Sequence, residues 1–175
     1  RRNNDENEIR LHNLSSGSEK VLTQGQRAKF SKNSRWLGYF ISPSAADRKK
    51  SKKPLRNQFR LMDLSKGDSL TIKEVSNFAF SDQSDFLAMK HYSAKGKKSN
   101  GADLLVRNLA TGSEFNFGNV AEFSWQEEGG LLAMLIDADG KAGNGVQIFD
   151  SKTGVLKVLD NKKAVYIKQR NLFGR

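Results

Sequence analysis

Two kinds of hairpin alternate along this 175-residue chain, and their repetition limits the folds that it can adopt. The first kind joins two short strands through a turn that ends in glycine, as in residues 104–117, LLVRNLATGSEFNF. Three further copies occupy residues 8–23, 59–72 and 146–159. A tight turn with positive φ explains the glycines, which stand 50, 45 and 42 residues apart: Gly17, Gly67, Gly112 and Gly154.

The second kind of hairpin is aromatic, and residues 76–92, SNFAFSDQSDFLAMKHY, give its clearest copy. Phe78 and Phe80 share one face at a period of two, and apolar residues alternate again after the polar turn. Similar sequences occur at residues 28–40, AKFSKNSRWLGYF, and 123–135, FSWQEEGGLLAML. This alternation predicts strands rather than helices.

Together the two hairpins make a unit of four short strands that repeats every 42 to 50 residues, which is typical of a β-propeller blade. We predict an all-β fold: a partial β-propeller of about three complete four-stranded antiparallel blades plus half a blade. The predicted propeller covers residues 8–165, with its whole blades at 26–73, 75–118 and 120–160.

The remaining residues fit this repeat less well. Residues 8–23 supply the half blade, residues 164–168 suggest the first strand of another, and residues 1–7 and 169–175 are expected to be irregular or truncated ends. A propeller protects its strand edges by closing into a ring of typically four to eight blades. We therefore expect a piece of a longer protein, poorly behaved in isolation because its terminal strands are open.

The bulk composition fits a turn-rich globular β protein and excludes several classes. Hydrophobic residues make up 37% of the chain and charged residues 28%, with 15 glycines and 2 prolines. The absence of cysteine excludes disulfides, thiolate catalysis and cysteine-bound zinc. No run of apolar residues is long enough for a spanning helix. Localisation stays open between a bacterial periplasmic or secreted protein and a cytoplasmic one.

The net charge of +11 is concentrated in two insertions, residues 42–58 and 93–102, each between the second and third strands of a blade. Both should emerge on the same rim of a propeller. Such a rim could bind polyanions or steer charged ligands, but a solvated loop is the favoured interpretation, because no aromatic residues are interleaved for stacking. The predicted electrostatic rim comprises Arg48, Lys49, Lys50, Lys52, Lys53, Arg56, Lys95, Lys97 and Lys98.

No other group of residues predicts chemistry in this chain, so no catalytic, cofactor-binding or metal-binding residue is assigned. His12 and His91 are the only histidines and read as ordinary strand positions. Residues 137–141, DADGK, lack the further ligands of an EF-hand calcium loop. The pair Glu127–Glu128 could hold a substrate ammonium, but its place before two glycines favours a polar turn.

Recurring aromatic residues are explained without a ligand. They occupy equivalent places in successive repeats, where packing between neighbouring blades would bury them. The residues concerned are Phe30, Trp36, Phe78, Phe80, Phe123 and Trp125.

Over residues 8–165 the repeats resemble the amino-terminal propeller of bacterial serine peptidases of the prolyl oligopeptidase family, akin to dipeptidyl and acylaminoacyl peptidases. The resemblance rests on F-S-x(6)-L-A, on D/N-L-x-x-G, on the lysine-rich insertion and on the phrase GNGVQIFD. TolB-like and WD-repeat propellers, which act as interaction or binding modules, use similar motifs and are the alternative.

The resemblance implies a parent hydrolase in which the propeller limits access of peptide substrates to a carboxy-terminal α/β-hydrolase domain. In that family the catalytic serine, aspartate and histidine lie in the second domain, so none is carried over to this chain. The glutamate pair of dipeptidyl peptidases is not transferred to Glu127–Glu128 either, because a strand turn replaces the inserted helix. The implied partners are the hydrolase domain and peptides, with no nucleic acid and no membrane segment.

Overall fold

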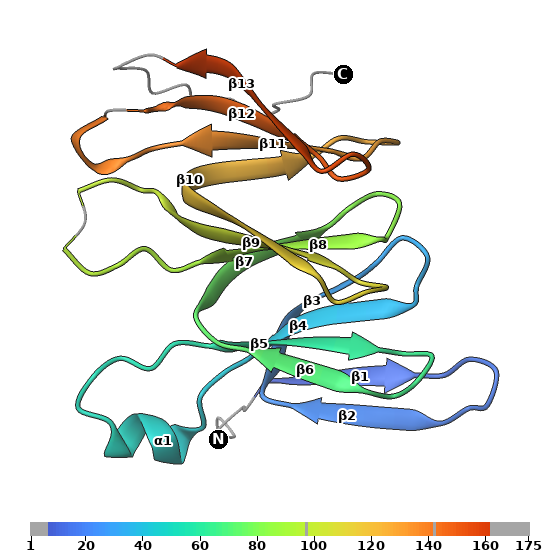
Figure 1. Cartoon of the computed structure of the whole chain (residues 1–175). Helices are drawn as coiled ribbons and strands as arrows, with labels where there is room; N and C mark the ends of the chain where they lie inside the picture. The colour runs from blue at the N-terminus through green and yellow to red at the C-terminus, as the bar shows by residue number, and fades with distance from the viewer. Residues whose placement is uncertain (1–6, 97, 142, 162–175) are drawn as a thin grey trace. The chain divides into compact units, whose positions relative to one another are not determined.

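The computed structural model describes residues 7–96, 98–141 and 143–161, which form antiparallel strands, one α-helix and one 3-10 turn (Figure 1). The predicted strand at 164–168 and the predicted irregular ends, apart from residue 7, lie outside the described residues. The chain divides into two compact units, residues 1–75 and 76–175, and each is described by itself.

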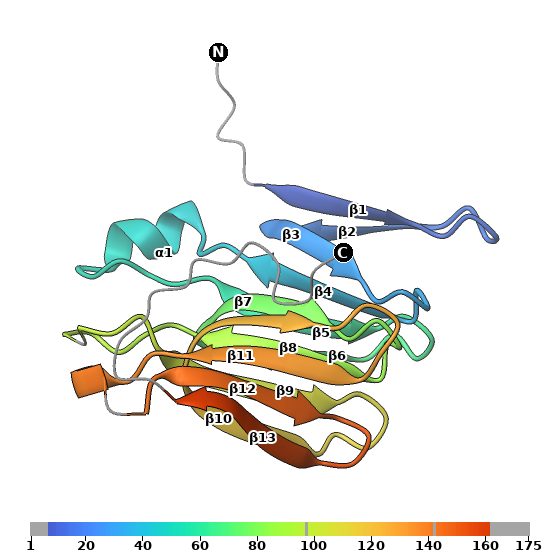
Figure 2. The ribbon, with the colours of Figure 1, turned by 90° about the horizontal axis from the view of Figure 1, so that it is seen from above.

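The first unit contains a two-stranded hairpin and a four-stranded antiparallel sheet in the order β3-β4-β5-β6. Figure 2 shows the hairpin beside β3. The hairpin consists of β1 (Glu8–His12) and β2 (Glu19–Thr23). The sheet consists of β3 (Gly25–Phe30), β4 (Trp36–Ile41), β5 (Gln58–Asp63) and β6 (Ser69–Ile72).

Strand β4 is buried on both faces, as its continuous apolar sequence WLGYFI would require. On one face Leu37 and Tyr39 pack with Leu22 and Met62, so the hairpin and the sheet share a core. On the other face Phe40 lies opposite Phe59 in the register, with ring centroids 5.6 Å apart in an edge-on arrangement. Burial of these large side chains is the main stabilising contribution in this unit.

The second unit is a single seven-stranded antiparallel sheet in the order β7-β8-β9-β10-β11-β12-β13. Its strands are β7 (Val75–Phe80), β8 (Phe86–His91), β9 (Ala102–Asn108), β10 (Glu114–Trp125), β11 (Leu131–Ile136), β12 (Gly145–Asp150) and β13 (Val155–Asn161). A 3-10 turn, η1 (Asp139–Lys141), precedes β12.

Strand β10 serves two four-stranded groups, whereas two separate strands were expected from the sequence. Its first half pairs with β9 and its second half with β11 (Figure 1). The register shifts between Phe117 and Val120, where Asn119 has a φ of 58°. A bulge of this kind bends a strand without breaking it, so one strand can pass from one group to the next.

The two halves of this sheet pack against each other through one hydrophobic core. Phe149 of β12 lies 5.0 Å from Phe117 of β10, measured between ring centroids. Trp125 lies 6.3 Å from Phe86 and donates from Nε1 to the carbonyl of Ala79 at 3.1 Å. Packing of neighbouring groups therefore accounts for Trp125, as the repeat of aromatic residues predicted.

The other recurring aromatic residues are buried to different degrees. Phe78 is buried, and Phe123 packs partly buried against the core of the second unit. The prediction that packing buries all of them is wrong for Phe30, whose side chain is 53% exposed. All four residues from Arg27 to Phe30 are exposed, so neither face of this end of β3 is covered.

All four glycine turns have the geometry that the sequence predicted. Each glycine has a φ between 69° and 79°, and its amide donates to the carbonyl of the Asn or Asp four residues earlier at 2.8–2.9 Å. The side chain of that Asn or Asp accepts from the backbone of the turn as well, as Asn108 does from Ala110 at 2.9 Å. This local bonding satisfies the turn without help from the rest of the fold.

Candidate functional site

The basic insertion of the first unit contains a helix, α1 (Ala45–Lys50), where a loop was expected. Ser44 caps it: its Oγ accepts from the backbone amide of Asp47 at 3.0 Å and donates to the Asp47 carboxylate at 2.7 Å. Basic residues fill the last turn, where they interact favourably with the helix dipole. The Ser44-x-x-Asp47 spacing is a capping signal that sequence reasoning missed.

A cavity of about 520 Å³ lies between α1 and the ends of β4 and β5. The helix contributes Asp47 and Lys50, one turn apart on the same face. Strand ends and connecting segments supply the rest of the lining: Gln24, Ile41, Ser42, Pro43, Ser44, Ser51, Leu55, Arg56 and Gln58. The insertion thus creates a concave feature lined by polar, charged and apolar residues, and we treat it as the candidate site.

Only two of the predicted rim residues line this cavity. Lys50 does so from the helix, and Arg56 does so from the segment before β5, where its guanidinium forms an ion pair with Glu74. The other four basic residues of the insertion are exposed and do not line it: Arg48, Lys49, Lys52 and Lys53.

The second basic segment belongs to the second unit. Lys95 and Lys98 are exposed there, and Lys97 lies outside the described residues. Since the two units are described separately, a common rim for both segments stays a prediction.

The residues that resemble a calcium loop hold this second basic segment in place. Asp137 accepts from the backbone amide of Asn100 at 2.8 Å, and Asp139 accepts from that of Ser99 at 3.0 Å. The backbones approach so closely that a Cβ on Gly101 would lie 2.1 Å from the carbonyl oxygen of Asp137. These two carboxylates thus fix the backbone of the second basic segment by accepting its hydrogen bonds.

The two histidines occupy different settings. His12 in β1 has Nε2 3.0 Å from a carboxylate oxygen of Glu19. His91 ends β8, and its Nε2 is buried without a hydrogen-bond partner in the described part of the chain. Across residues 7–96, 98–141 and 143–161, no group of three or more His, Asp or Glu side chains is arranged to bind a metal ion.

Glu127 and Glu128 lie in the turn between β10 and β11. Glu128 has a φ of 57°, and its amide donates to Asp82 at 3.1 Å. Ser34 and Ser84 have φ values of 57° and 62° in the corresponding turns of the other repeats. The left-handed residue is therefore part of the repeated turn geometry.

Lys90 is a charged residue at a position where the other repeats have Phe40 and Leu135. Its Nζ donates to the backbone carbonyl of Ala121, and burial lowers the pKa of its ammonium while Glu122 and Asp137 oppose that shift. The amine thus links two strands of the second unit rather than facing a cavity.

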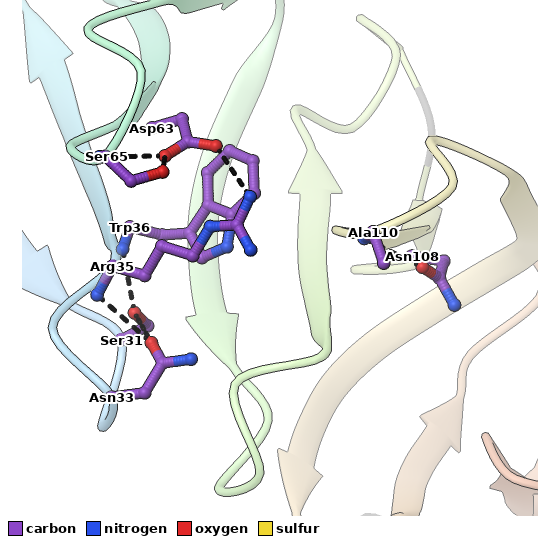
Figure 3. Close-up of polar contacts among 8 residues, drawn as sticks. All are labelled: Ser31, Asn33, Arg35, Trp36, Asp63, Ser65, Asn108 and Ala110. Atoms are coloured by element: carbon purple, nitrogen blue, oxygen red, sulfur yellow. Dashed lines mark hydrogen bonds and ion pairs between the residues drawn. The ribbon is translucent and has the colours of Figure 1, made fainter.

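An ion pair of the first unit joins the β3–β4 turn to the β5–β6 turn (Figure 3). Arg35 donates to Asp63 at 3.0 Å, and the other carboxylate oxygen of Asp63 accepts from the amide and hydroxyl of Ser65. The hydrogen bond from Arg35, with those from Ser65, holds the pKa of Asp63 well below its usual value. The Asp63 carboxylate accepts three hydrogen bonds here, and its side chain is 5% exposed, so the pair has a structural role in joining the turns.

Comparisons with known proteins identify the fold but not a family. A scan against protein-family models and a search of curated proteins both find no match. Among solved structures, the β-propeller domain of the Trilobed protease from Pyrococcus furiosus is 13% identical, with a TM-score of 0.57 over 93% of this chain and 52% of that chain.

Two further structures belong to peptidases. Acylaminoacyl peptidase from Pyrococcus horikoshii is 13% identical, with a TM-score of 0.52 over 89% of this chain and 28% of that chain. A chain from a study of two prolyl endopeptidases is 13% identical, with a TM-score of 0.53 over 84% of this chain and 25% of that chain.

At such identities the likeness concerns the fold alone. It confirms the predicted all-β fold of antiparallel propeller blades. The chain spans between about a quarter and a half of the length of these structures. No helix in the part of the chain that the structure describes is long and apolar enough to cross a membrane.

Proposed function

We propose that this chain is part of the propeller of a serine peptidase of the prolyl oligopeptidase family, where it limits access of peptides to an α/β-hydrolase domain. The observation that carries the proposal is the fold likeness to the propeller domain of a protease and to peptidases, at TM-scores of 0.52–0.57. The repeat motifs quoted above support it independently. The chain itself supplies the barrier, and the catalytic serine, aspartate and histidine come from the partner domain.

Such a gate would act by excluding folded proteins from the active site. A ring of packed blades is rigid because each blade buries large side chains against its neighbour, as Trp125 and Phe149 do here. A rigid ring passes an extended peptide but not a folded protein. The basic residues of the rim would add attraction for acidic peptides, which is stronger at low salt.

A labelling experiment tests the proposal on the natural protein that carries this chain. The protein is tagged, purified and treated with a fluorophosphonate, which reacts with activated serines. We expect one labelled serine in a G-x-S-x-G sequence outside residues 1–175, together with hydrolysis of short peptides and none of folded proteins. For acidic peptides, kcat/KM should fall as salt rises.

Two results would overturn the proposal. The first is a carrier protein that contains no fluorophosphonate-reactive serine. The second is a carrier that digests folded and unfolded substrates at equal rates, because no gate would then be needed.

A further inference from the structure

The cavity beside α1 combines the cations Lys50 and Arg56, the anion Asp47, neutral polar residues and an apolar wall. Its neutral polar lining residues are Gln24, Ser42, Ser44, Ser51 and Gln58. Its apolar part consists of Ile41, Pro43 and Leu55. A volume of about 520 Å³ lies within the range of small-ligand pockets.

Lys50 is the cation of this cavity that has no partner. The described part of the chain gives its ammonium neither an ion pair nor a hydrogen bond, and Lys50 is exposed. By contrast, Arg56 is paired with Glu74, and the carboxylate of Asp47 accepts from Ser44 at the start of the helix. An anionic group that enters the cavity would therefore meet Lys50 as its ion-pair partner, with the charge of Asp47 one turn away opposing it.

The surroundings of Lys50 match the remaining groups of a peptide end. The amides of Gln24 and Gln58 can donate to and accept from a peptide bond. Leu55 is 45% exposed and lines the same cavity, so an apolar side chain could cover it. A simple inorganic anion would use the ammonium and leave this apolar wall uncovered.

We propose that this cavity binds the carboxy-terminal residue of a peptide. The terminal carboxylate pairs with Lys50, the preceding peptide group bonds to the glutamine amides, and an apolar side chain covers Leu55. The choice of a peptide rests on the proposed function, whereas the carboxylate and the apolar wall follow from the cavity itself. The exposed basic residues around the helix would raise the local concentration of such anions.

Binding is measured by isothermal titration calorimetry on the natural protein that carries residues 1–175, treated beforehand with the fluorophosphonate. The two probes are N-acetyl-alanyl-leucine and its carboxamide. We expect the acid to bind and the amide to bind at least roughly tenfold more weakly, because a charge-assisted hydrogen bond is lost. Lys50→Gln should weaken binding of the acid by a similar factor. Lys49→Gln is the matched control, since Lys49 lies on the same helix but does not line the cavity.

Leu55→Ser tests the apolar wall. It should weaken the binding of N-acetyl-alanyl-leucine more than the binding of N-acetyl-diglycine. Equal affinity for the acid and the amide would overturn the proposal. Equal losses of affinity in the Lys49→Gln and Lys50→Gln variants would do so too. The proposal also fails if the parent protein is folded by circular dichroism and binds neither probe. The assay measures binding and not hydrolysis, so its failure leaves the peptidase proposal standing. A carrier without a reactive serine would likewise leave this site standing.

Discussion

At the residue scale, each glycine turn has an Asn or an Asp whose side chain accepts backbone hydrogen bonds. The Asn side chain is neutral and the Asp side chain is charged. Asn13 and Asn108 accept backbone hydrogen bonds in their turns without a charge. Asp63 and Asp150 accept them with a charge, and only Asp63 also receives a guanidinium, from Arg35. Asp63→Asn therefore removes the ion pair and keeps the turn.

We expect Asp63→Asn to lower the free energy of unfolding at pH 7 by about 1–3 kcal/mol. The pKa of Asp63 is depressed in the folded state, so its contribution is fully present above the unfolded-state pKa of about 3.9 and is lost as the pH falls below it. The variant should lose less stability than the parent between pH 5 and pH 3. Urea unfolding at a series of pH values measures this difference.

Asp150→Asn serves as the control for this prediction, because it is the same substitution at the same turn position without an arginine partner. Its effect at pH 7 should be smaller. An Asp63→Asn protein with the same acid sensitivity as the parent would contradict the role of the Arg35–Asp63 pair.

At the element scale, the conformation of the links between successive blades could not be predicted from the sequence. Gln24, Glu74 and Asn119 adopt φ values of 58–63°, each just before a buried residue. That residue starts the next strand after Gln24 and Glu74, whereas after Asn119 it lies inside β10. A glycine at these positions would have indicated a positive φ, as it did in the four hairpin turns, but these links contain larger residues. At Asn119 the register shift leaves β10 continuous, and alternation of apolar residues alone could not reveal this.

Strand β13 is the most exposed apolar element in the described part of the chain. Val155, Leu156, Val158 and Leu159 are 44–60% exposed, and β12 is its only strand partner among the described residues. Apolar strands with a free edge promote association. Val158→Lys should therefore weaken concentration-dependent self-association, while stability changes by less than about 0.5 kcal/mol.

Sedimentation velocity over a range of protein concentrations measures this effect. Lys157→Val is the opposite change on the same strand and should strengthen association. If both variants sediment as the parent does, β13 is not the associating surface. A monodisperse parent at every concentration would also show that the expectation of open, reactive edges is wrong.

At the scale of the whole molecule, repetition made the fold predictable and the site difficult to predict. Repeats such as Gly67 and Gly112 align at a fixed spacing, so the four-strand unit can be read from the sequence. The cavity beside α1 arises at the insertion of one repeat, residues 42–58. Its lining comes from three separate segments, and only the basic residues Lys50 and Arg56 stood out beforehand.

The division into two compact units predicts that damage to one core stays local. Leu132→Ala removes a fully buried side chain from the core of the second unit and should cost about 2–5 kcal/mol. Hydrogen exchange should then quicken across β8 to β12, while amides of β4 and β5 keep their protection. Leu156→Ala, the same change at a side chain that is 44% exposed, is the control and should alter exchange little. Uniform acceleration in both units would mean instead that they unfold as one cooperative body.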